Sequence, residues 1–227
     1  MYGLVRFIES LGVELVLDVG ANQGQYASDL RMLGFEGRIV SFEPIRECYD
    51  LLATVAARDP GWDVRHTALG ATPGTAQINV AANGGASSSL LPMMTRHRLA
   101  APEATYVRTE SVEVQRLDDA VTGLPVGTRA FLKIDTQGFE RAVLEGAPQL
   151  LSGPVVGVQL ELSLVSLYEG APIYDEMLSF MAERGFRLAW LEPGFADPES
   201  GEMLQFDAAF VKDVRHGGEG RSGDDAV

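Results

Sequence analysis

Residues 15–26 read Leu-Val-Leu-Asp-Val-Gly-Ala-Asn-Gln-Gly-Gln-Tyr, and this stretch decides the fold. Its first five residues form a short, mostly apolar run that predicts a buried strand ending at Gly20. Residues 22–33 follow with apolar side chains at helical spacing, which predicts a helix. Gly20 and Gly24 allow a tight turn and a close approach of the backbone to a ligand, which the free amides of the helix would face.

The same alternation of strands and helices continues along the chain. Further strands are predicted over residues 38–42, 62–69, 75–81, 111–117, 130–134, 155–162, 187–191 and 205–211. Further helices are predicted over residues 2–11, 44–57, 139–150 and 173–183. This order is typical of an α/β fold, a mostly parallel sheet with helices on both faces.

We expect one α/β domain over residues 1–212. The segment 82–109 is polar, rich in Gly and Ser, and long for a connector, so we interpret it as a lid or binding loop. Residues 213–227 are rich in Gly, Ser and Asp and are predicted to form a disordered tail.

The bulk composition excludes several classes of function. The net charge of −14 opposes binding to nucleic acid or to anionic lipid surfaces. The single cysteine, Cys48, excludes an internal disulfide framework or a multi-cysteine zinc site and fits a reducing compartment. No apolar run reaches the ~20 residues of a membrane span, and the first residues lack the pattern of a signal peptide. We therefore expect a soluble, cytoplasmic protein.

The turn after the first strand favours one class of ligand over another. A dinucleotide fingerprint needs three glycines spaced G-x-G-x-x-G, but Asn22 and Gln25 occupy the second and third positions. Asp18, at the end of the strand, would repel a pyrophosphate, whereas its carboxylate suits a cationic amino-acid end. This combination favours S-adenosylmethionine, which carries an ammonium and a sulfonium group.

A second carboxylate supports that interpretation. Glu43 ends the second predicted strand, 25 positions after Asp18, where an acidic residue can accept hydrogen bonds from both ribose hydroxyls. The alternative role is to stabilise the start of the helix at Pro44 as a carboxylate near its N-terminus.

Several motifs together resemble the FkbM-type methyltransferases. They are LDVGANQGQY at residues 17–26, FEP at 42–44, HTALG at 66–70, SSSL at 87–90, LDD at 117–119 and LKIDTQGFERAVLEGA at 132–147. They occur in the family's order between about residues 13 and 211. The resemblance implies the Rossmann-like, seven-stranded class I methyltransferase fold, with a mostly parallel sheet and an antiparallel C-terminal strand.

The resemblance also implies a cofactor and a set of contacts. S-adenosylmethionine would be held by residues of these motifs, with the pair at 68–69 flanking the adenine: Asp18, Gly20, Ala21, Asn22, Gly24, Tyr26, Glu43, Pro44, Ala68, Leu69 and Asp135. Characterised members are mainly O-methyltransferases of macrolides or of sugars on glycolipids. The expected acceptor is therefore a hydroxyl of a sugar (a glycolipid or glycoside) or of a polyketide-like secondary metabolite.

Asp135 is the first candidate for the catalytic base. It ends the strand over residues 130–134, where it would lie close to the methyl group and could take the proton of the acceptor hydroxyl. Its alternative roles are contact with the cofactor ammonium and capping of the next helix. His97, in the segment 82–109, is the second candidate base, and its alternative is a surface histidine.

Other polar residues receive weaker assignments. Asp135 and Glu161 could serve as oxygen ligands for Mg²⁺, but two carboxylates leave a metal site undecided. Glu140 is interpreted as a structural carboxylate at a helix start, and Lys133 as a partner for a carboxylate without a chemical role. The predicted N-terminal helix could cover the site, pair with a second chain in a homodimer, or pack onto its own core.

Two rival functions remain open on the sequence. An NAD(P)-dependent oxidoreductase or epimerase should show three spaced glycines and a Tyr-x-x-x-Lys pair, and both are missing. A non-catalytic scaffold with this fold would be expected to lose Asp18, Glu43 or Asp135, and all three are present.

Overall fold

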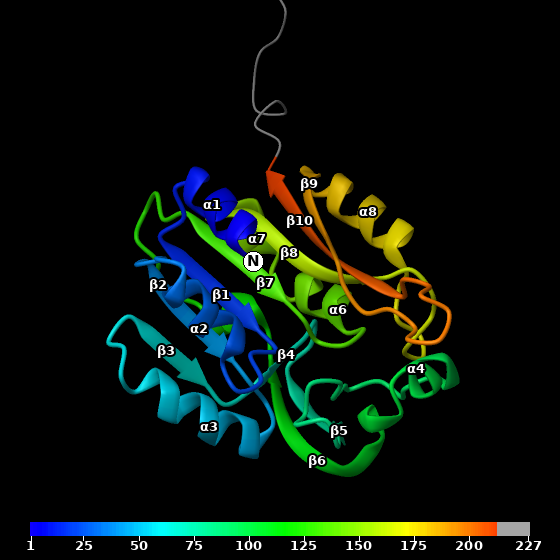
Figure 1. Cartoon of the computed structure of the whole chain (residues 1–227). Coiled ribbons are helices and arrows are strands. Elements are labelled where there is room, and N and C mark those ends of the chain that lie inside the picture. Colours follow the sequence, from blue (N-terminus) through cyan, green and yellow to red (C-terminus); the bar gives the residue numbers. More distant parts are fainter. Residues whose placement is uncertain (213–227) are drawn as a thin grey trace, which may run out of the picture.

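The computed structural model describes residues 1–212, so the tail expected over residues 213–227 lies outside the described residues. Its main sheet has seven strands in the order β3-β2-β1-β7-β8-β10-β9 (Figure 1). Their bounds are β1 (Leu15–Val19), β2 (Arg38–Phe42), β3 (Trp62–Arg65), β7 (Ala130–Ile134), β8 (Val155–Ser163), β9 (Phe186–Pro193) and β10 (Gln205–Lys212). Only β10 runs antiparallel to its neighbours, which confirms the expected seven-stranded fold with an antiparallel C-terminal strand.

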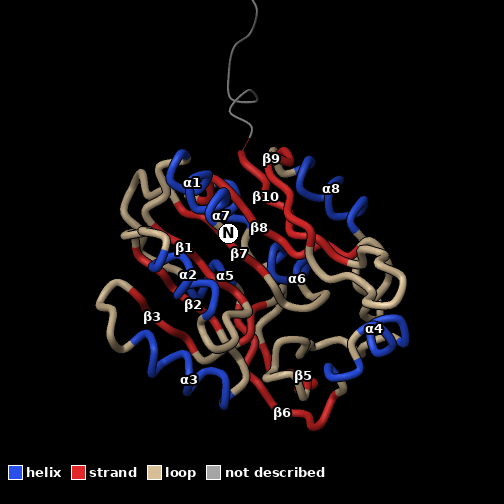
Figure 2. The backbone as a smooth tube through the Cα atoms, in the orientation of Figure 1, coloured by secondary structure: helices blue, strands red, loops and turns tan. Residues whose placement is uncertain are grey.

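Helices cover both faces of this sheet (Figure 2). One face packs against α1 (Tyr2–Ser10), α2 (Gln25–Met32) and α3 (Arg46–Ala56). The other packs against α5 (Leu117–Ala120), α6 (Glu140–Glu145), α7 (Pro148–Ser152) and α8 (Tyr174–Glu183).

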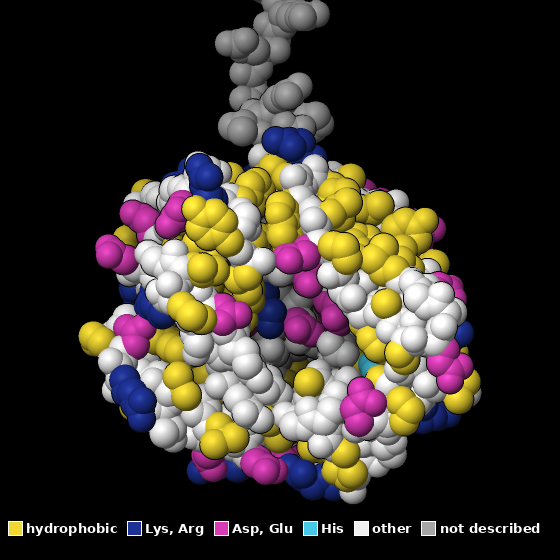
Figure 3. All heavy atoms as spheres, in the orientation of Figure 1, with side chains coloured by type: hydrophobic (Ala, Val, Ile, Leu, Met, Phe, Trp, Pro, Cys, Tyr) yellow, Lys and Arg dark blue, Asp and Glu magenta, His cyan; other side chains and the backbone are white. Residues whose placement is uncertain are grey.

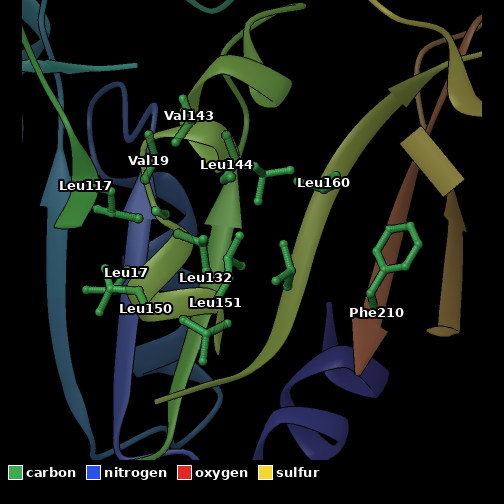
Figure 4. Close-up of a cluster of buried hydrophobic side chains, with 14 of the residues drawn as sticks. Leu17, Val19, Leu117, Leu132, Val143, Leu144, Leu150, Leu151, Leu160 and Phe210 are labelled. Carbon is green, nitrogen blue, oxygen red and sulfur yellow. The ribbon is translucent and has the colours of Figure 1, made fainter. Parts of the chain in front are cut away.

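Strand side chains alternate between the two faces of the sheet. On the central strands, one face carries only apolar buried side chains, and the other also carries buried polar ones. On β1 and β7, Leu17 and Leu132 join the core beneath α6 and α7 (Figure 4). Asp18 and Lys133, the next residues on each strand, therefore point towards α1 and α2. The buried polar side chains of β1, β2, β7 and β8 all lie on this second face.

A second sheet of three strands corrects part of the prediction. Its order is β4-β6-β5, formed by β4 (Ala68–Leu69), β5 (Gly74–Ala81) and β6 (Tyr106–Gln115). The single strand expected over residues 62–69 is wrong, because β3 ends at Arg65 and β4 pairs with β6 instead of β2. The hydroxyl of Thr67 donates to the Glu113 carbonyl 3.2 Å away and fixes the chain at this change of sheet.

Two helices also differ from their expected bounds. The helix expected over residues 139–150 is divided into α6 and α7, because Pro148 lacks the amide that would continue the first helix. Helix α2 begins at Gln25 because Asn22 and Gly24 have φ of +49° and +90°, outside the helical region.

The segment 82–109 contains more regular structure than a loop. It holds α4 (Thr95–Ala100), a 3₁₀ turn η1 (Pro102–Ala104) and the first residues of β6. A buried apolar cluster joins it to the stretch 165–171 and to Leu204. Among residues 1–212, no helix is long and apolar enough to cross a membrane.

The central strand β7 should carry much of the stability. We predict that Leu132→Ala lowers the free energy of unfolding by about 2–5 kcal/mol, because it leaves a cavity where a fully buried side chain stood. Leu99→Ala, at a side chain that is 71% exposed, should change it by less than about 0.5 kcal/mol. Urea unfolding of both variants tests this, and equal losses would contradict the assigned core.

Candidate active site

A cavity of about 610 Å³ opens at the carboxyl ends of β1, β2 and β7, where the strand order reverses. Figure 3 shows it as a hollow near the middle of the visible face, with acidic and basic side chains inside. Nine of the predicted cofactor residues line it: Gly20, Ala21, Asn22, Tyr26, Glu43, Pro44, Ala68, Leu69 and Asp135. Asp18 and Gly24 lie outside its wall.

The glycine turn depends on its missing side chains. A Cβ on Gly20 would stand 1.9 Å from the backbone oxygen of Asp135, so only glycine lets the ends of β1 and β7 approach this closely. A Cβ on Gly24 would meet Leu52 at 2.9 Å and Trp62 at 3.0 Å. Gly20 therefore shapes the cavity, whereas Gly24 lets the turn pack against the core beneath α3.

Two backbone amides hold the Glu43 carboxylate and leave part of its hydrogen-bond acceptor capacity free. Its Oε2 accepts a hydrogen bond from the Asn22 amide and its Oε1 accepts one from the Ile45 amide, both at 2.8 Å. A carboxylate offers about four acceptor sites, so about two remain for hydroxyl groups in the cavity. Burial raises the pKa of Glu43 to about 7, although the two amides and Lys133 lower it.

A row of buried polar side chains lies across the sheet under the cavity. Ser41, Asp18, Lys133 and Gln159 are register partners on β2, β1, β7 and β8. The Ser41 hydroxyl donates to Asp18 Oδ2 at 3.0 Å. Lys133 Nζ lies 3.2 Å from Asp18 Oδ1, in ionic contact but without hydrogen-bond geometry. Asp18 is thus fully buried, with Oδ2 bonded to Ser41 and the charge at Oδ1 compensated by Lys133.

Asp135 and Glu161 share a single amide donor. Gln137 Nε2 donates to Asp135 Oδ1 at 2.8 Å and to Glu161 Oε2 at 2.7 Å. Its Oε1 accepts a hydrogen bond from the Tyr168 hydroxyl at 2.5 Å, which fixes the orientation of the amide. Burial and then the charge of Asp135 raise the pKa of Glu161 well above its usual range. Asp135 itself is 39% exposed and faces the cavity.

The two carboxylates do not fit the Mg²⁺ site that the sequence left undecided. The amide nitrogen of Gln137 points hydrogen atoms at both of them, which occupies the place where a cation would bridge them. Within residues 1–212, no group of three His, Cys, Asp or Glu side chains is arranged to hold a metal ion.

His97 is buried outside the cavity and does not have the position expected of a catalytic base. It is 2% exposed, packs against the rings of Tyr168 and Phe195, and does not line the cavity. Burial lowers its pKa, and its Nδ1 has no hydrogen-bond partner in the described residues. Both interpretations from the sequence, an exposed histidine and a base in the site, fail on this burial.

The turn after β7 and the segment 82–109 form adjoining parts of the wall. Glu140 Oε1 accepts hydrogen bonds from the amides of Thr136 and Gly138, which agrees with its structural assignment. The Ser89 hydroxyl donates to the Gln137 carbonyl at 2.7 Å and so joins the two parts. Ser88 and Ser89 line the cavity.

The charge of the wall is strongly negative. Five carboxylates line the cavity, from Asp29, Glu43, Asp135, Glu192 and Asp207. Among the described residues, Lys133 supplies the only Lys or Arg side chain of the wall. This surface attracts a ligand with cationic groups.

Several wall residues were missed or only partly assigned from the sequence. Lys133 was expected to pair with a carboxylate, and the strand register identifies that carboxylate as Asp18. Gln137 adopts a left-handed φ of +55°, which nothing in the residue type indicates. Asp207 and Glu192 come from the terminal strand pair, whose place in the sheet required the tertiary structure.

Comparisons with known proteins agree with this geometry. A family profile described as the methyltransferase FkbM domain matches residues 18–188, about three quarters of the chain. A search of curated proteins finds no significant match.

Solved structures share the fold at low sequence identity. Magnesium protoporphyrin IX methyltransferase from Synechocystis PCC 6803 with bound S-adenosylmethionine is 10% identical, with a TM-score of 0.51 over 93% of this chain and 76% of that one. The same enzyme with bound S-adenosylhomocysteine is 9% identical, with a TM-score of 0.50 over 92% and 80%. An rRNA methylase from Streptococcus thermophilus is 10% identical, with a TM-score of 0.50 over 92% and 94%.

The family match covers the glycine turn, Glu43 and Asp135, and the neighbours share the arrangement of strands around the cavity. The chain therefore belongs to the FkbM methyltransferase family and is an S-adenosylmethionine-dependent methyltransferase.

Proposed function

We propose that this methyltransferase acts on a hydroxyl oxygen of a sugar, in a glycolipid or glycoside, or of a polyketide-like acceptor. The observation that carries the proposal is the partly exposed Asp135 carboxylate, which lies at the end of β7 beside the glycine turn. A hydroxyl is a weak nucleophile, and a carboxylate within reach can accept its proton as the new bond forms.

The cavity wall fits the cofactor along its length. Ala68 and Leu69 supply an apolar edge for the adenine, and the free acceptor sites of Glu43 suit the two ribose hydroxyls. Gly20 and Lys133 line the part of the wall beside β7, which we assign to the amino-acid end. We assign the other contacts to the remaining wall residues, Ala21, Asn22, Tyr26 and Pro44, while Asp18 and Gly24 support the wall from beneath.

When bound, S-adenosylmethionine supplies an electrophilic methyl group on its sulfonium. The protein's contribution is to align the acceptor oxygen and to receive its proton. Asp135 is suited to both tasks because Gln137 Nε2 donates to one of its oxygens, and Lys133 lies 3.7 Å from the other. The base is thereby held in one orientation at the wall.

The wall also limits the class of acceptor. Its excess of carboxylates repels phosphate and carboxylate groups, which favours an acceptor that presents hydroxyl donors. We propose that the segment 82–109 binds this acceptor, because residues 85–86 and 88–90 contribute to the wall and Ser89 is bonded to the Gln137 carbonyl. Gly84 and Gly85, with φ of +68° and +80°, are the positions where the segment could bend as a lid.

Replacing the base tests the proposed reaction. We predict that Asp135→Asn lowers kcat by about 10²–10⁴-fold, because the amide cannot accept the proton. The assay follows transfer of labelled methyl groups to a panel of methyl glycosides and macrolide aglycones. Asp119→Asn, at an exposed position on α5, is the matched control and should retain full activity. An Asp135→Asn variant as active as wild type would refute the assignment of the base.

Glu43 should dominate the affinity for the ribose. We predict that Glu43→Gln weakens S-adenosylhomocysteine binding by about 1.5–3 kcal/mol, or roughly 10- to 150-fold, because hydrogen bonds to a charged group are lost. Glu47→Gln, at an exposed side chain on α3, the helix that follows Glu43, should bind as wild type does. Calorimetric titration compares them, and equal affinities for both variants would remove Glu43 from the site.

The same carboxylate predicts a pH dependence of binding. Because burial raises the pKa of Glu43 to about 7, its ionised fraction falls as the pH drops from 8 to 6. The protonated form loses acceptor capacity, so we expect S-adenosylhomocysteine to bind more weakly at pH 6 than at pH 8. Titrations across this range should show the slope in wild type and a flatter profile in Glu43→Gln.

Tyr168 should affect the rate of methyl transfer indirectly, because its hydroxyl orients the Gln137 amide. We predict that Tyr168→Phe lowers kcat roughly tenfold, because the hydroxyl that orients the Gln137 amide is lost, while the KM for S-adenosylmethionine stays nearly constant. Tyr106→Phe removes another phenol hydroxyl, bonded to the Leu91 carbonyl, and should have a smaller effect. Equal losses in the two variants would mean that the Gln137 orientation does not matter for the reaction.

A further inference from the structure

Lys133 has a position that its pairing with a carboxylate does not explain. It lies one residue before the end of β7, is 7% exposed, and lines the cavity. Its Nζ donates to the Gly20 carbonyl at 3.1 Å, in the turn where we place the amino-acid end of the cofactor. The ammonium also lies 5.3 Å from the centre of the Tyr26 ring, another part of the wall.

The ammonium group has a donor left for a ligand. It carries three N–H donors. The Gly20 carbonyl lies 3.1 Å from Nζ, Asp18 Oδ1 lies 3.2 Å away, and Asp135 Oδ2 lies 3.7 Å away. Only the first of these contacts has hydrogen-bond geometry. Burial would lower the pKa of Lys133, but the charges of Asp18 and Asp135 more than offset this and raise it. The side chain therefore stays cationic.

The cofactor carries one anionic group, the carboxylate of its amino-acid end. Elsewhere on the wall, that carboxylate would face Asp29, Glu43, Asp135, Glu192 or Asp207, all of which repel it. Lys133 is the only described side chain of the wall with the opposite charge. The other cation of the wall, the Met1 ammonium, is paired with Glu192 at 3.2 Å, so Lys133 is the favourable partner for this group.

We infer that Lys133 binds the carboxylate of the cofactor's amino-acid end, and that Asp18 acts as its positioning residue. The inference rests on the placement of the cofactor in this cavity. Asp18 is fully buried beneath the wall, with one oxygen bonded to Ser41 and the other beside Lys133. The expected contact of Asp18 with the cofactor ammonium is replaced by an indirect role, in which its charge holds Lys133 at the glycine turn.

Three probes separate this role from a general loss of binding. S-adenosylhomocysteine has the full amino-acid end, its decarboxylated analogue 5′-S-(3-aminopropyl)-5′-thioadenosine keeps only the amine, and 5′-methylthioadenosine has neither group. Calorimetric titration of each against wild type and Lys133→Met measures what the carboxylate contributes. The two smaller probes report whether the adenosine part of the site is intact.

We expect Lys133→Met to weaken S-adenosylhomocysteine roughly 10- to 100-fold, as for loss of a charge-assisted hydrogen bond. Binding of 5′-methylthioadenosine should change less than about twofold. The preference of wild type for S-adenosylhomocysteine over the decarboxylated analogue should disappear in the variant.

A second variant guards against misfolding. Lys133→Met leaves Asp18 as a buried charge without its partner, which destabilises proteins strongly. The double variant Asp18→Asn, Lys133→Met removes both charges and should fold while showing the same loss of preference.

Two results would overturn the inference. If both variants retain the wild-type preference for the carboxylate, that group is bound elsewhere, for example by the amides at the start of α2. If all three probes weaken equally in the stably folded double variant, Lys133 has only a structural role. Failure of wild type to bind any probe would instead overturn the placement of the cofactor, and this inference with it.

Discussion

The contact between Asp18 and Lys133 is the constraint on which the site depends. The two residues are register partners on adjacent central strands, and both side chains are buried on the same face of the sheet. Either charge alone would be costly at this depth, so each requires the other. Their pairing keeps a cation at the point where the strand order reverses, directly beneath the glycine turn.

From this pair the polar row extends in both directions. Ser41 links it to Trp62 on β3, whose indole donates to the serine hydroxyl at 3.0 Å. On the other side, Gln159 accepts a hydrogen bond from Tyr26 and donates to Asp207. The opposite face of the same strands is wholly apolar (Figure 4). The face beneath α5–α8 therefore supplies apolar core alone, whereas the face beneath α1–α3 combines an apolar cluster with the floor of the cavity.

The sequence predicted the parts of this arrangement that depend on local chain geometry. The strand ending at Gly20, the carboxylate of Glu43 and the carboxylate of Asp135 all follow from strand-to-helix turns, and the structure places these residues around one cavity. The sequence alone could not reveal which side chains, distant along the chain, meet across the sheet. The isolation of Asp18 from the cavity, the burial of His97 and the left-handed backbone of Gln137 are all set by tertiary contacts. The break in the helix expected over residues 139–150 was also missed, although it is a local feature that Pro148 itself signals.

A crystal structure of the protein with S-adenosylhomocysteine tests the central claim, that the polar row and the glycine turn together form the cofactor site. We predict ribose hydroxyls within hydrogen-bond distance of Glu43, and the amino-acid carboxylate within hydrogen-bond distance of Lys133 Nζ, with Asp18 still buried beneath it. A ligand bound away from Glu43, or with its amino-acid end directed away from Lys133, would contradict the account.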